Sequence, residues 1–415
     1  MSKIIKPLAG ILMGGLACGA ALAGTEKGGA KVPVAPEEPR DWCDAFKIMG
    51  GPVFPNQIND KNWLIQEFEF MGRVQWQWAN VDGDDVNGDD FDRSITDWRR
   101  VRIGAQGRVL DYLSFKANIN LVRDGRQVGG NSNLGFQSFD ELKITADIGR
   151  MMNIQYFDAL KLTWGRHKFN VSEEVWESSK KIKTIERSAI ANKAYGPQRL
   201  SGFTLDAEKD EWSYTLGLFG EFDLETVGWF DNGFSYYLSL GYEPTERAEY
   251  IFDAAWADYD EENILSENFG YDWIFSLSGR YDFGKWEFMW NAIYGDNGGG
   301  GDRGGDFYGL VLMPSYWILD DTLEAVFRYQ FQGAEEDEGI RLNGRYVRRT
   351  EALGSSDVNS GRGDEHHSFY LGLNWYICDH NLKLMTGIEY DDLEVPSRDS
   401  DVEAWTYFFG ARTYF

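Results

Sequence analysis

The feature that most constrains the fold is an alternation of polar and apolar residues with a period of two, repeated from residue 64 to the end of the chain. In one segment Leu113, Phe115 and Ala117 alternate with Ser114 and Lys116. Successive side chains of a strand point to opposite faces, so each segment predicts a strand with one apolar and one polar face. Sixteen segments show this pattern, near residues 64–79, 97–110, 112–123, 138–149, 158–169, 199–208, 211–222, 233–243, 248–258, 269–281, 285–295, 306–317, 322–332, 366–377, 381–391 and 402–415.

The connections between these segments alternate between short and long. Seven short turns are expected at residues 111, 150–157, 209–210, 244–247, 282–284, 318–321 and 378–380. Eight long loops are expected at residues 80–96, 124–137, 170–198, 223–232, 259–268, 296–305, 333–365 and 392–401. Outer-membrane barrels carry short turns on the periplasmic side and long loops outside, and their strands are about ten residues long. The pattern therefore predicts an all-β fold, a 16-stranded antiparallel transmembrane β-barrel over residues 63–415.

The aromatic content separates this barrel from a soluble sandwich or propeller. The chain holds 16 Trp, 21 Tyr and 27 Phe within 415 residues of net charge −26. Many of these rings fall at predicted strand ends, as in the aromatic girdles at the two membrane interfaces. They are Trp76, Trp78, Tyr236, Tyr237, Trp286, Trp290, Tyr316, Trp317, Trp375 and Tyr376. A closed soluble core would bury the polar second face, whereas a water-filled lumen solvates it. A propeller would also show a repeat of fixed period, and the chain has none.

The two ends of the chain indicate an exported protein of the outer membrane. Residues 1–23 read as a signal peptide, with Lys3 and Lys6 before an apolar stretch that ends at Ala23. Residues 24–62 include the Pro-rich run KVPVAPEEP and are interpreted as a periplasmic tether. The last strand alternates up to a terminal aromatic residue, Phe415, which resembles the signal read by the barrel assembly machinery. The expected location is the outer membrane of a Gram-negative-type cell envelope, with lipid as a partner.

Two cysteines, Cys43 and Cys378, remain after removal of the signal peptide. Cys378 falls in a short periplasmic turn, on the same side as the tether that carries Cys43. An oxidising compartment permits one disulfide between them, and two free thiols are the alternative. Neither cysteine forms a metal-ligand pattern with the four histidines, and no metal or cofactor is expected.

Positive charge is concentrated at the third long loop. Over residues 166–199 there are eight basic and four acidic residues, a charge of +4 within a mature chain of 39 basic and 67 acidic residues, or −28. The overall acidity argues against nucleic acid as a partner. Residues 171–190 of this loop are compatible with short helices.

The same region resembles a known family. The runs 160–169 (LKLTWGRHKF), 173–174 (EE), 178–180 (SSK) and 186–188 (ERS), and the earlier run 99–104 (RRVRIG), resemble the phosphate-selective porins O and P. The resemblance implies a trimeric channel whose third loop folds inward and whose basic residues bind phosphate or other anions. It makes Lys180, Lys181, Lys183 and Arg187 the candidates for an anion-binding constriction.

Further cations fall on the predicted lumen face of the strands. They are Arg73, Arg100, Arg102, Arg108, Lys116, Lys143 and Lys161. They would provide several moderate anion sites in series, which conduction requires. The alternative is that they pair with Glu67, Glu69, Glu141 and Asp147 to hold the wall together. The acidic loop 80–96 would oppose anions at the mouth.

The expected function is a porin for passive uptake of small hydrophilic solutes, with anions such as phosphate preferred. The alternative is a structural or adhesive barrel with little or cation-selective conductance. An enzyme is not expected, because the only Ser–His pair on one strand face is His366 with Ser368, a weak catalytic signal.

Overall fold

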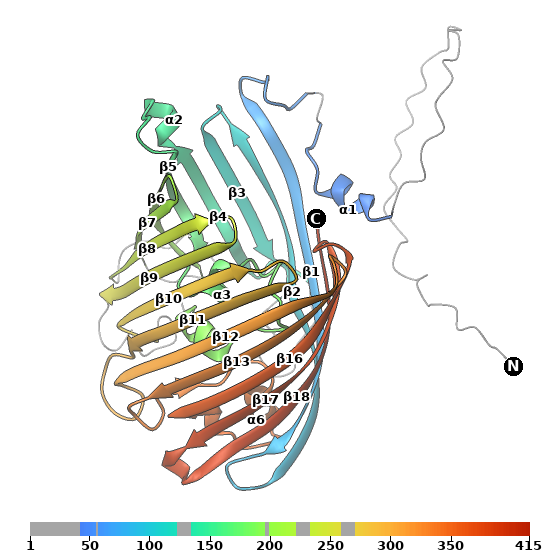
Figure 1. Cartoon of the computed structure of the whole chain (residues 1–415), viewed down its shortest axis with the longest axis vertical. Coiled ribbons are helices and arrows are strands. Elements are labelled where there is room, and N and C mark those ends of the chain that lie inside the picture. Colours follow the sequence, from blue (N-terminus) through green and yellow to red (C-terminus); the bar gives the residue numbers. More distant parts are fainter. Residues whose placement is uncertain (1–41, 55–56, 123–133, 196–198, 221–232, 259–269) are drawn as a thin grey trace, which may run out of the picture. The chain divides into compact units, whose positions relative to one another are not determined.

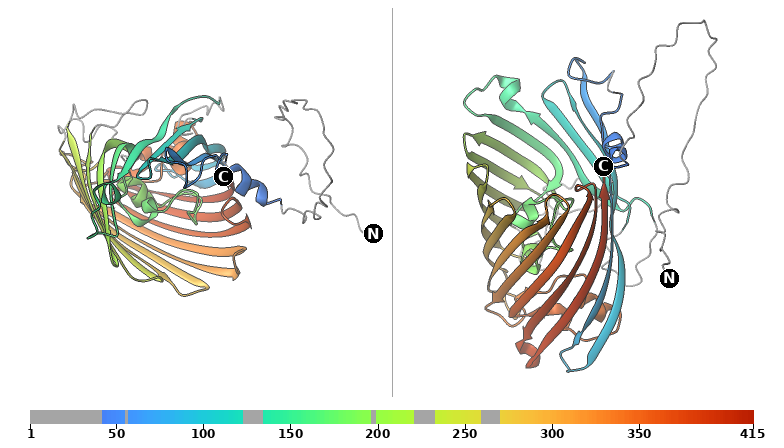
Figure 2. Two further views of the ribbon diagram at one scale, coloured as in Figure 1. Left: turned by 90° about the horizontal axis from the view of Figure 1, so that it is seen from above. Right: turned by 45° about the vertical axis from the view of Figure 1, so that its right-hand side comes forward.

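Sixteen antiparallel strands form a closed β-barrel in the computed structural model. Figures 1 and 2 show how these strands run side by side around the wall. The structure describes residues 42–54, 57–122, 134–195, 199–220, 233–258 and 270–415. Each barrel strand pairs with its neighbour in sequence, and β1 pairs with β18 to close the barrel. This confirms the predicted fold and strand count. The predicted signal peptide, about half of the tether, the predicted loops 223–232 and 259–268, and parts of the predicted loops 124–137 and 170–198 lie outside the described residues.

The elements of the barrel wall have the following bounds. The strands are β1 (Ile65–Asp84), β2 (Asp90–Val109), β3 (Leu113–Asn120), β4 (Ser138–Asp147), β5 (Ala159–Lys168), β6 (Arg199–Lys209), β7 (Trp212–Phe219), β8 (Phe234–Thr245), β9 (Ala248–Asp258), β10 (Trp273–Asp282), β11 (Trp286–Asp296), β12 (Asp306–Leu319), β13 (Leu323–Ala334), β16 (Glu365–Cys378), β17 (Leu382–Val395) and β18 (Ser400–Tyr414).

Short elements lie in the connections. They are α1 (Asp44–Met49), α2 (Ile148–Met152), α3 (Glu173–Trp176), α4 (Ala189–Ala194), β14 (Ile340–Arg341), α6 (Val347–Ala352), η2 (Asn359–Gly361), β15 (Arg362–Gly363) and η3 (Pro396–Arg398). Within the described ranges, no helix has the length and apolar character needed to cross a membrane.

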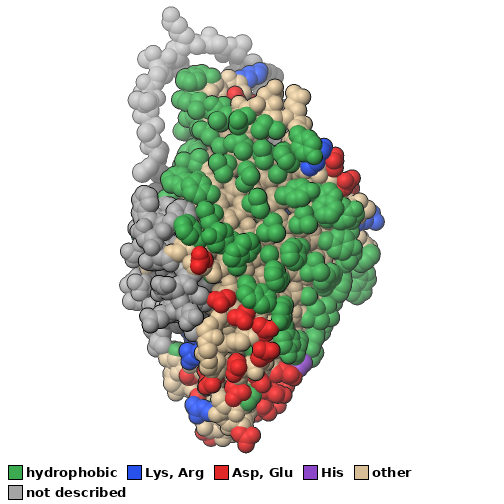
Figure 3. Space-filling model, turned by 90° about the vertical axis from the view of Figure 1, so that its left-hand side faces the viewer, with side chains coloured by type: hydrophobic (Ala, Val, Ile, Leu, Met, Phe, Trp, Pro, Cys, Tyr) green, Lys and Arg blue, Asp and Glu red, His purple; other side chains and the backbone are tan. Residues whose placement is uncertain are grey.

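The alternating sequence pattern separates two faces of the wall. Outward side chains such as Phe70 and Leu371 are more than half exposed, whereas inward polar side chains such as Gln75 and Arg412 are buried. Figure 3 shows the outer surface on one side, where apolar side chains cover most of the wall and acidic side chains gather at one end. The charge and the rings therefore face two different environments.

Three of the ten predicted girdle aromatics face inward. Tyr237 is 4% exposed and donates to Asp253, and the Tyr376 hydroxyl donates to Glu324 over 2.6 Å. Trp317 packs on Tyr376 with ring centroids 5.1 Å apart. Each follows another aromatic residue directly, and neighbours on a strand point to opposite faces, so only one of each pair meets lipid.

The predicted loop 80–96 is mostly strand. β1 and β2 continue to Asp84 and from Asp90, and only residues 85–89 form the turn. In this extension the pattern inverts: Val81 and Phe91 are buried inside, and Asp82 and Asp92 are exposed outside. This inversion is expected where the outer face of the hairpin meets water, because polar side chains then face the solvent and apolar side chains pack inside. Likewise β17 and β18 occupy most of the predicted loop 392–401.

The predicted long loop 333–365 also folds inward. We call residues 335–364, between β13 and β16, the cap loop. Its side chains Ile340, Leu342, Tyr346, Val347 and Val358 are at most 5% exposed and join the apolar cluster that includes Val81 and Phe91. The cap loop therefore fills part of the barrel interior next to the β1–β2 and β17–β18 hairpins.

The N-terminal segment belongs to the barrel unit from Cys43 onward, rather than from near Trp63. β18 ends beside Gly72, where the Phe415 and Gly72 backbones exchange two hydrogen bonds of 3.1 Å. Beyond this point β1 has no further pairing with β18. Pro52 bridges to Glu69 there, and Val53 N–H donates to the Phe68 carbonyl over 2.7 Å. The segment thus covers an edge that would otherwise expose unpaired backbone groups.

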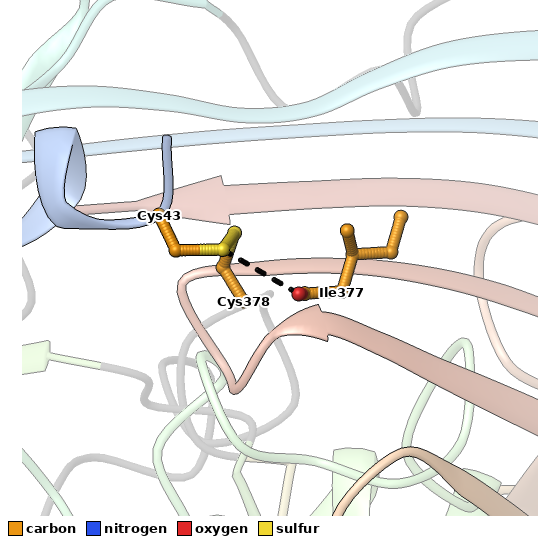
Figure 4. Close-up of a disulfide and its surroundings, with 3 residues drawn as sticks. All are labelled: Cys43, Ile377 and Cys378. Carbon is orange, nitrogen blue, oxygen red and sulfur yellow. Dashed lines mark hydrogen bonds between the residues drawn. A yellow bond between two sulfur atoms is a disulfide. The ribbon is translucent and has the colours of Figure 1, made fainter. Parts of the chain in front are cut away.

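A disulfide holds this segment in place. Cys43 is bonded to Cys378, with Cα atoms 5.4 Å apart, and Figure 4 shows the pair beside Ile377. The bond joins the N-terminal segment to the β16–β17 turn, 335 residues away in sequence. Cross-links that close long loops restrict the unfolded chain and commonly contribute about 2–4 kcal/mol.

Replacing both cysteines in C43S/C378S should weaken the covered edge of β1. We expect the barrel to unfold in detergent at a lower temperature than the parent protein, measured by the heat-dependent shift on a denaturing gel. A reducing agent should lower the transition of the parent and leave the variant unchanged. Equal transitions for parent and variant would contradict a stabilising role for the bond.

Candidate functional site

The third long loop, residues 169–198 between β5 and β6, lies inside the barrel. It is described to residue 195 and contains α3 and α4. Val171, Val175, Ile185 and Ile190 are fully buried against the interior. Ser188 begins α4 as its N-cap, accepting from Ala191 N–H over 3.2 Å. The predicted inward fold of this loop is therefore what the structure has.

Asp253 on β9 is the first anchor of the loop. Its buried carboxylate accepts from Ser172 N–H over 3.1 Å, from the Trp176 indole N–H over 3.1 Å and from the Tyr237 hydroxyl over 2.8 Å. A buried carboxylate needs such donors to offset the loss of water. These bonds hold the start of the loop against β8 and β9.

Arg280 on β10 is the second anchor. One of its terminal nitrogens, Nη2, lies 2.7 Å from carboxylate oxygens of both Glu173 and Glu177. Glu287 on β11 lies 3.6 Å from the other terminal nitrogen, Nη1. This guanidinium neutralises acidic loop residues that face β10 and β11.

Three cations on β13, β17 and β18 bind the returning part of the loop through its backbone. Arg328 donates to the Glu186 carbonyl over 2.8 Å, and Lys383 donates to the Ile182 carbonyl over 2.8 Å. Arg412 donates to the Ile185 carbonyl. By donating to backbone carbonyls, these three cations hold the returning part of the loop against the wall.

Two of the four predicted constriction residues are tied to this anchored side. Lys183 Nζ lies 2.7 Å from Glu324 and 3.1 Å from Glu287. Arg187 is buried and donates to the carbonyls of Glu174 and Glu177, the latter over 2.9 Å. Lys183 is therefore ion-paired with the wall, and Arg187 cross-links the loop to itself.

The other two predicted residues lie at the tip of the loop. Lys181 is exposed. The Lys180 ammonium lies 4.4 Å from the centre of the Tyr414 ring, a cation–π contact that leaves its charge uncancelled. Burial lowers the pKa of Lys180 to about 8, with Arg73 and Lys116 acting in the same direction and Glu141 opposing them.

Four of the seven predicted wall cations have carboxylate partners within 3.1 Å. Lys116 and Lys143 share Glu141, at 2.5 and 3.1 Å, and Arg102 lies 2.8 Å from Asp140. Arg108 lies 2.5 Å from Asp60 of the N-terminal segment. These four wall cations therefore pair with carboxylates, as predicted. Of the predicted acidic partners, only Glu141 lies within 3.1 Å of one of them.

The remaining three wall cations have looser or neutral contacts. Lys161 is 3.9 Å from Glu208, while Arg73 donates to the Ser179 hydroxyl and Arg100 to the Gln75 side-chain oxygen over 2.7 Å. Among the other expected acids, Glu67 lies 3.9 Å from the predicted cation Arg108. Glu69 accepts from Gln106, and Asp147 pairs with Arg150.

A cluster on the β1–β6 side combines several of these groups, and we call it the basic wall cluster. Its two carboxylates are each shared between two cations, Asp140 by Arg102 and Arg199, and Glu141 by Lys116 and Lys143. Arg73 and Lys180 lie within the electrostatic reach of the same groups. Six cations and two carboxylates leave a charge of +4. The cluster consists of Arg73, Arg102, Asp140, Glu141, Lys116, Lys143, Lys180 and Arg199.

Open space is found on the same side. A cavity of about 260 Å³ is lined by residues of β1 to β4, among them Arg108, Lys116 and Lys143. Between the loop and the opposite wall, a cavity beside Lys183 and Arg280 measures about 10 Å³, which holds roughly one water molecule. The third loop thus packs closely on β10 to β12, and the larger space lies beside the cations of β1 to β4.

The sequence reasoning did not identify the roles of Asp140 and Arg199. Arg199 lies in the basic stretch that the charge count singled out, but Asp140 has no nearby sequence signal. Asp140 lies near the start of β4, after a long loop, and the fold brings it to Arg102 and Arg199 from other strands.

The His366–Ser368 pair does not form a nucleophile arrangement. His366 Nε2 lies 3.0 Å from Asp391, and its Nδ1 lies 2.9 Å from both Gln330 and Gln332. Both ring nitrogens are therefore engaged by groups other than Ser368, and the ring is part of the packed interior.

Comparison with known proteins supports a porin. The family model described as phosphate-selective porin O and P matches residues 68–263, which confirms the resemblance seen in the motifs. No curated protein sequence matches the chain.

Solved structures show the same fold at low identity. OprB of Pseudomonas putida has a TM-score of 0.54 at 13% identity, covering 84% of this chain and 94% of its own. The outer membrane channel DcaP of Acinetobacter baumannii has 0.53 at 10%, covering 84% and 97%. OmpT of Vibrio cholerae, in a structure described as a trimer form, has 0.51 at 12%, covering 84% and 99%.

Removing the Asp253 carboxylate should loosen the third loop. In D253A the donors of Ser172, Trp176 and Tyr237 lose a buried acceptor, at a cost of about 1–3 kcal/mol. We expect larger and noisier single-channel currents in planar bilayers. D206A is the matched control, because Asp206 binds Thr204 and Thr215 of the wall. An unchanged current in D253A would show that this anchor does not set the width of the channel.

Proposed function

We propose that this outer-membrane porin conducts small hydrophilic solutes and prefers anions, phosphate among them. The observation that carries the proposal is the basic wall cluster, a +4 group whose residues Lys116 and Lys143 line the open space at β1 to β4. A cation in a narrow, partly desolvated passage attracts an anion far more strongly than it does in bulk water. The passage lies between the tip of the third loop and strands β1 to β6, and the third loop is its constriction.

Anions pass several moderate sites instead of one tight site. Arg73 contacts the Ser179 hydroxyl and Lys180 contacts the Tyr414 ring, whereas Lys116 and Lys143 divide one carboxylate between them. Partial compensation lowers the affinity of each position, and ions leave such sites readily. We propose that Lys183 and Arg187 hold the loop in place. Lys180 and Lys181 lie at the tip of the loop, in the passage.

The acidic hairpin of β1 and β2 does not oppose this preference. Asp82, Asp84, Asp90 and Asp92 are exposed on the outer face of the hairpin, away from the lumen. Exposed charges more than about 8–10 Å apart are largely screened at physiological salt. The net acidity of the chain therefore says little about the selectivity of its passage.

The assembly is proposed to be a homotrimer, on the strength of the porin resemblance and the trimer form of the Vibrio cholerae relative in fold. Light scattering in detergent tests the number of chains.

The rival function, a structural or adhesive barrel without conductance, is tested by planar bilayers. Purified protein that gives no conductance steps would refute the channel.

Ion selectivity is the direct test of the proposed passage. In a salt gradient the reversal potential should show an anion preference, and phosphate should compete with chloride. Replacing Lys116, Lys143 and Lys180 together by Gln should lower the anion-to-cation permeability ratio by about five-fold or more, since three nearby charges are lost. K285Q is the control, because Lys285 pairs with Asp320 on an exposed turn. A cation-selective parent channel would remove phosphate from consideration.

The selectivity should also depend on pH through Lys180. Its pKa of about 8 means that the ammonium is charged at pH 6.5 and mostly neutral at pH 9.5. Anion preference should therefore fall as pH rises through this range. In K180Q this part of the pH dependence should vanish. An identical pH profile in the parent and in K180Q would show that Lys180 does not contribute.

A further inference from the structure

Glu186, on the returning part of the third loop, is a carboxylate at which four elements meet. It is 7% exposed and binds Arg99 of β2 through two contacts, 2.7 and 3.2 Å long. It also accepts from the Gln77 side chain of β1 over 3.0 Å. The fourth element is the cap loop.

The cap loop brings a second cation to this carboxylate. Arg345 Nε lies 3.6 Å from Glu186, while its Nη1 lies 2.6 Å from Asp97 of β2. Next to it, the Tyr346 hydroxyl accepts from Gln77, and Asn343 donates to the Arg187 carbonyl over 3.1 Å. Three cap-loop side chains thus bind either the third loop or the wall beside it.

Glu186 carries a charge opposite to that of its surroundings. Glu186 contacts Arg99 of β2 and Gln77 of β1, and the same two strands carry Arg102 and Arg73 of the basic wall cluster. An uncompensated carboxylate at this place would repel anions from the passage. Burial of the group makes its field reach farther than that of a surface charge.

We infer that Arg345 is a specificity-determining residue of the channel. It is supplied by the cap loop and, together with Arg99, offsets the charges of Glu186 and Asp97. The inference rests on the proposed anion passage and deepens it. It gives the cap loop a role in selectivity as well as in packing.

The test uses reversal potentials of the full-length protein in planar bilayers with a potassium chloride gradient. R345Q should lower the anion-to-cation permeability ratio by about two- to five-fold, because one buried positive charge is lost. E186Q should raise the ratio by a similar factor. The double variant R345Q/E186Q has the parent's net charge and should return close to the parent value.

R303Q is the matched control, since Arg303 pairs with Glu338 at the surface and is 59% exposed. It removes the same charge from the cap-loop side of the barrel and should leave the ratio unchanged. If R345Q alone does not fold, the fall in the ratio from E186Q to R345Q/E186Q still measures the contribution of Arg345. Variants R345Q and E186Q that shift the ratio in the same direction, or not at all, would overturn the inference.

The test of Arg345 and the test of the proposed function have different readouts. The sign of the parent's reversal potential tests anion preference. The opposite shifts of R345Q and E186Q test the role of Arg345, and they are expected whatever that sign proves to be.

Discussion

The structure depends on one constraint, the pairing of every backbone polar group that the membrane surrounds. Lipid offers no hydrogen bonds, so a spanning sheet must close on itself. The pairing of β1 with β18 closes it, and both strands run past each other for twelve residue pairs, from Arg73 with Tyr414 to Asp84 with Glu403. Below that point the segment around Pro52 continues along the edge of β1, and the Cys43–Cys378 bond fastens it there.

Closure with polar side chains inward creates a lumen, and the third loop then divides it unequally. On the side of β10 to β13 the charges of the loop and wall offset one another, as in the contacts of Arg280 with Glu173 and Glu177. On the side of β1 to β6 two carboxylates serve a larger number of cations. The asymmetry of charge follows from where the loop packs, because Glu173, Glu174 and Glu177 are bound to β10 and β13. Glu186 alone among the described acidic residues of the loop pairs with β2.

Much of the fold was predictable because strand periodicity is a local property. Residues such as Phe115 and Lys116 show their two faces within a few positions, so the strand number and the lumen-facing cations followed directly. Boundaries were harder to predict. In the β1–β2 hairpin the polarity inverts at Val81, and the cap loop buries Ile340 and Val358 against distant strands. No local pattern marks such burial, because its partners are far away in sequence.

The sequence by itself determined a closed barrel with a basic third loop and cations on the inner face, since alternation and charge can be read residue by residue. The sequence did not show which of these cations are neutralised by carboxylates. Lys180 and Lys183 are three residues apart and chemically identical, yet one lies over the Tyr414 ring and the other between Glu287 and Glu324. Only the tertiary structure decided which of them is neutralised, because an ion pair needs a partner within about 4 Å, and strands far apart in sequence supply it.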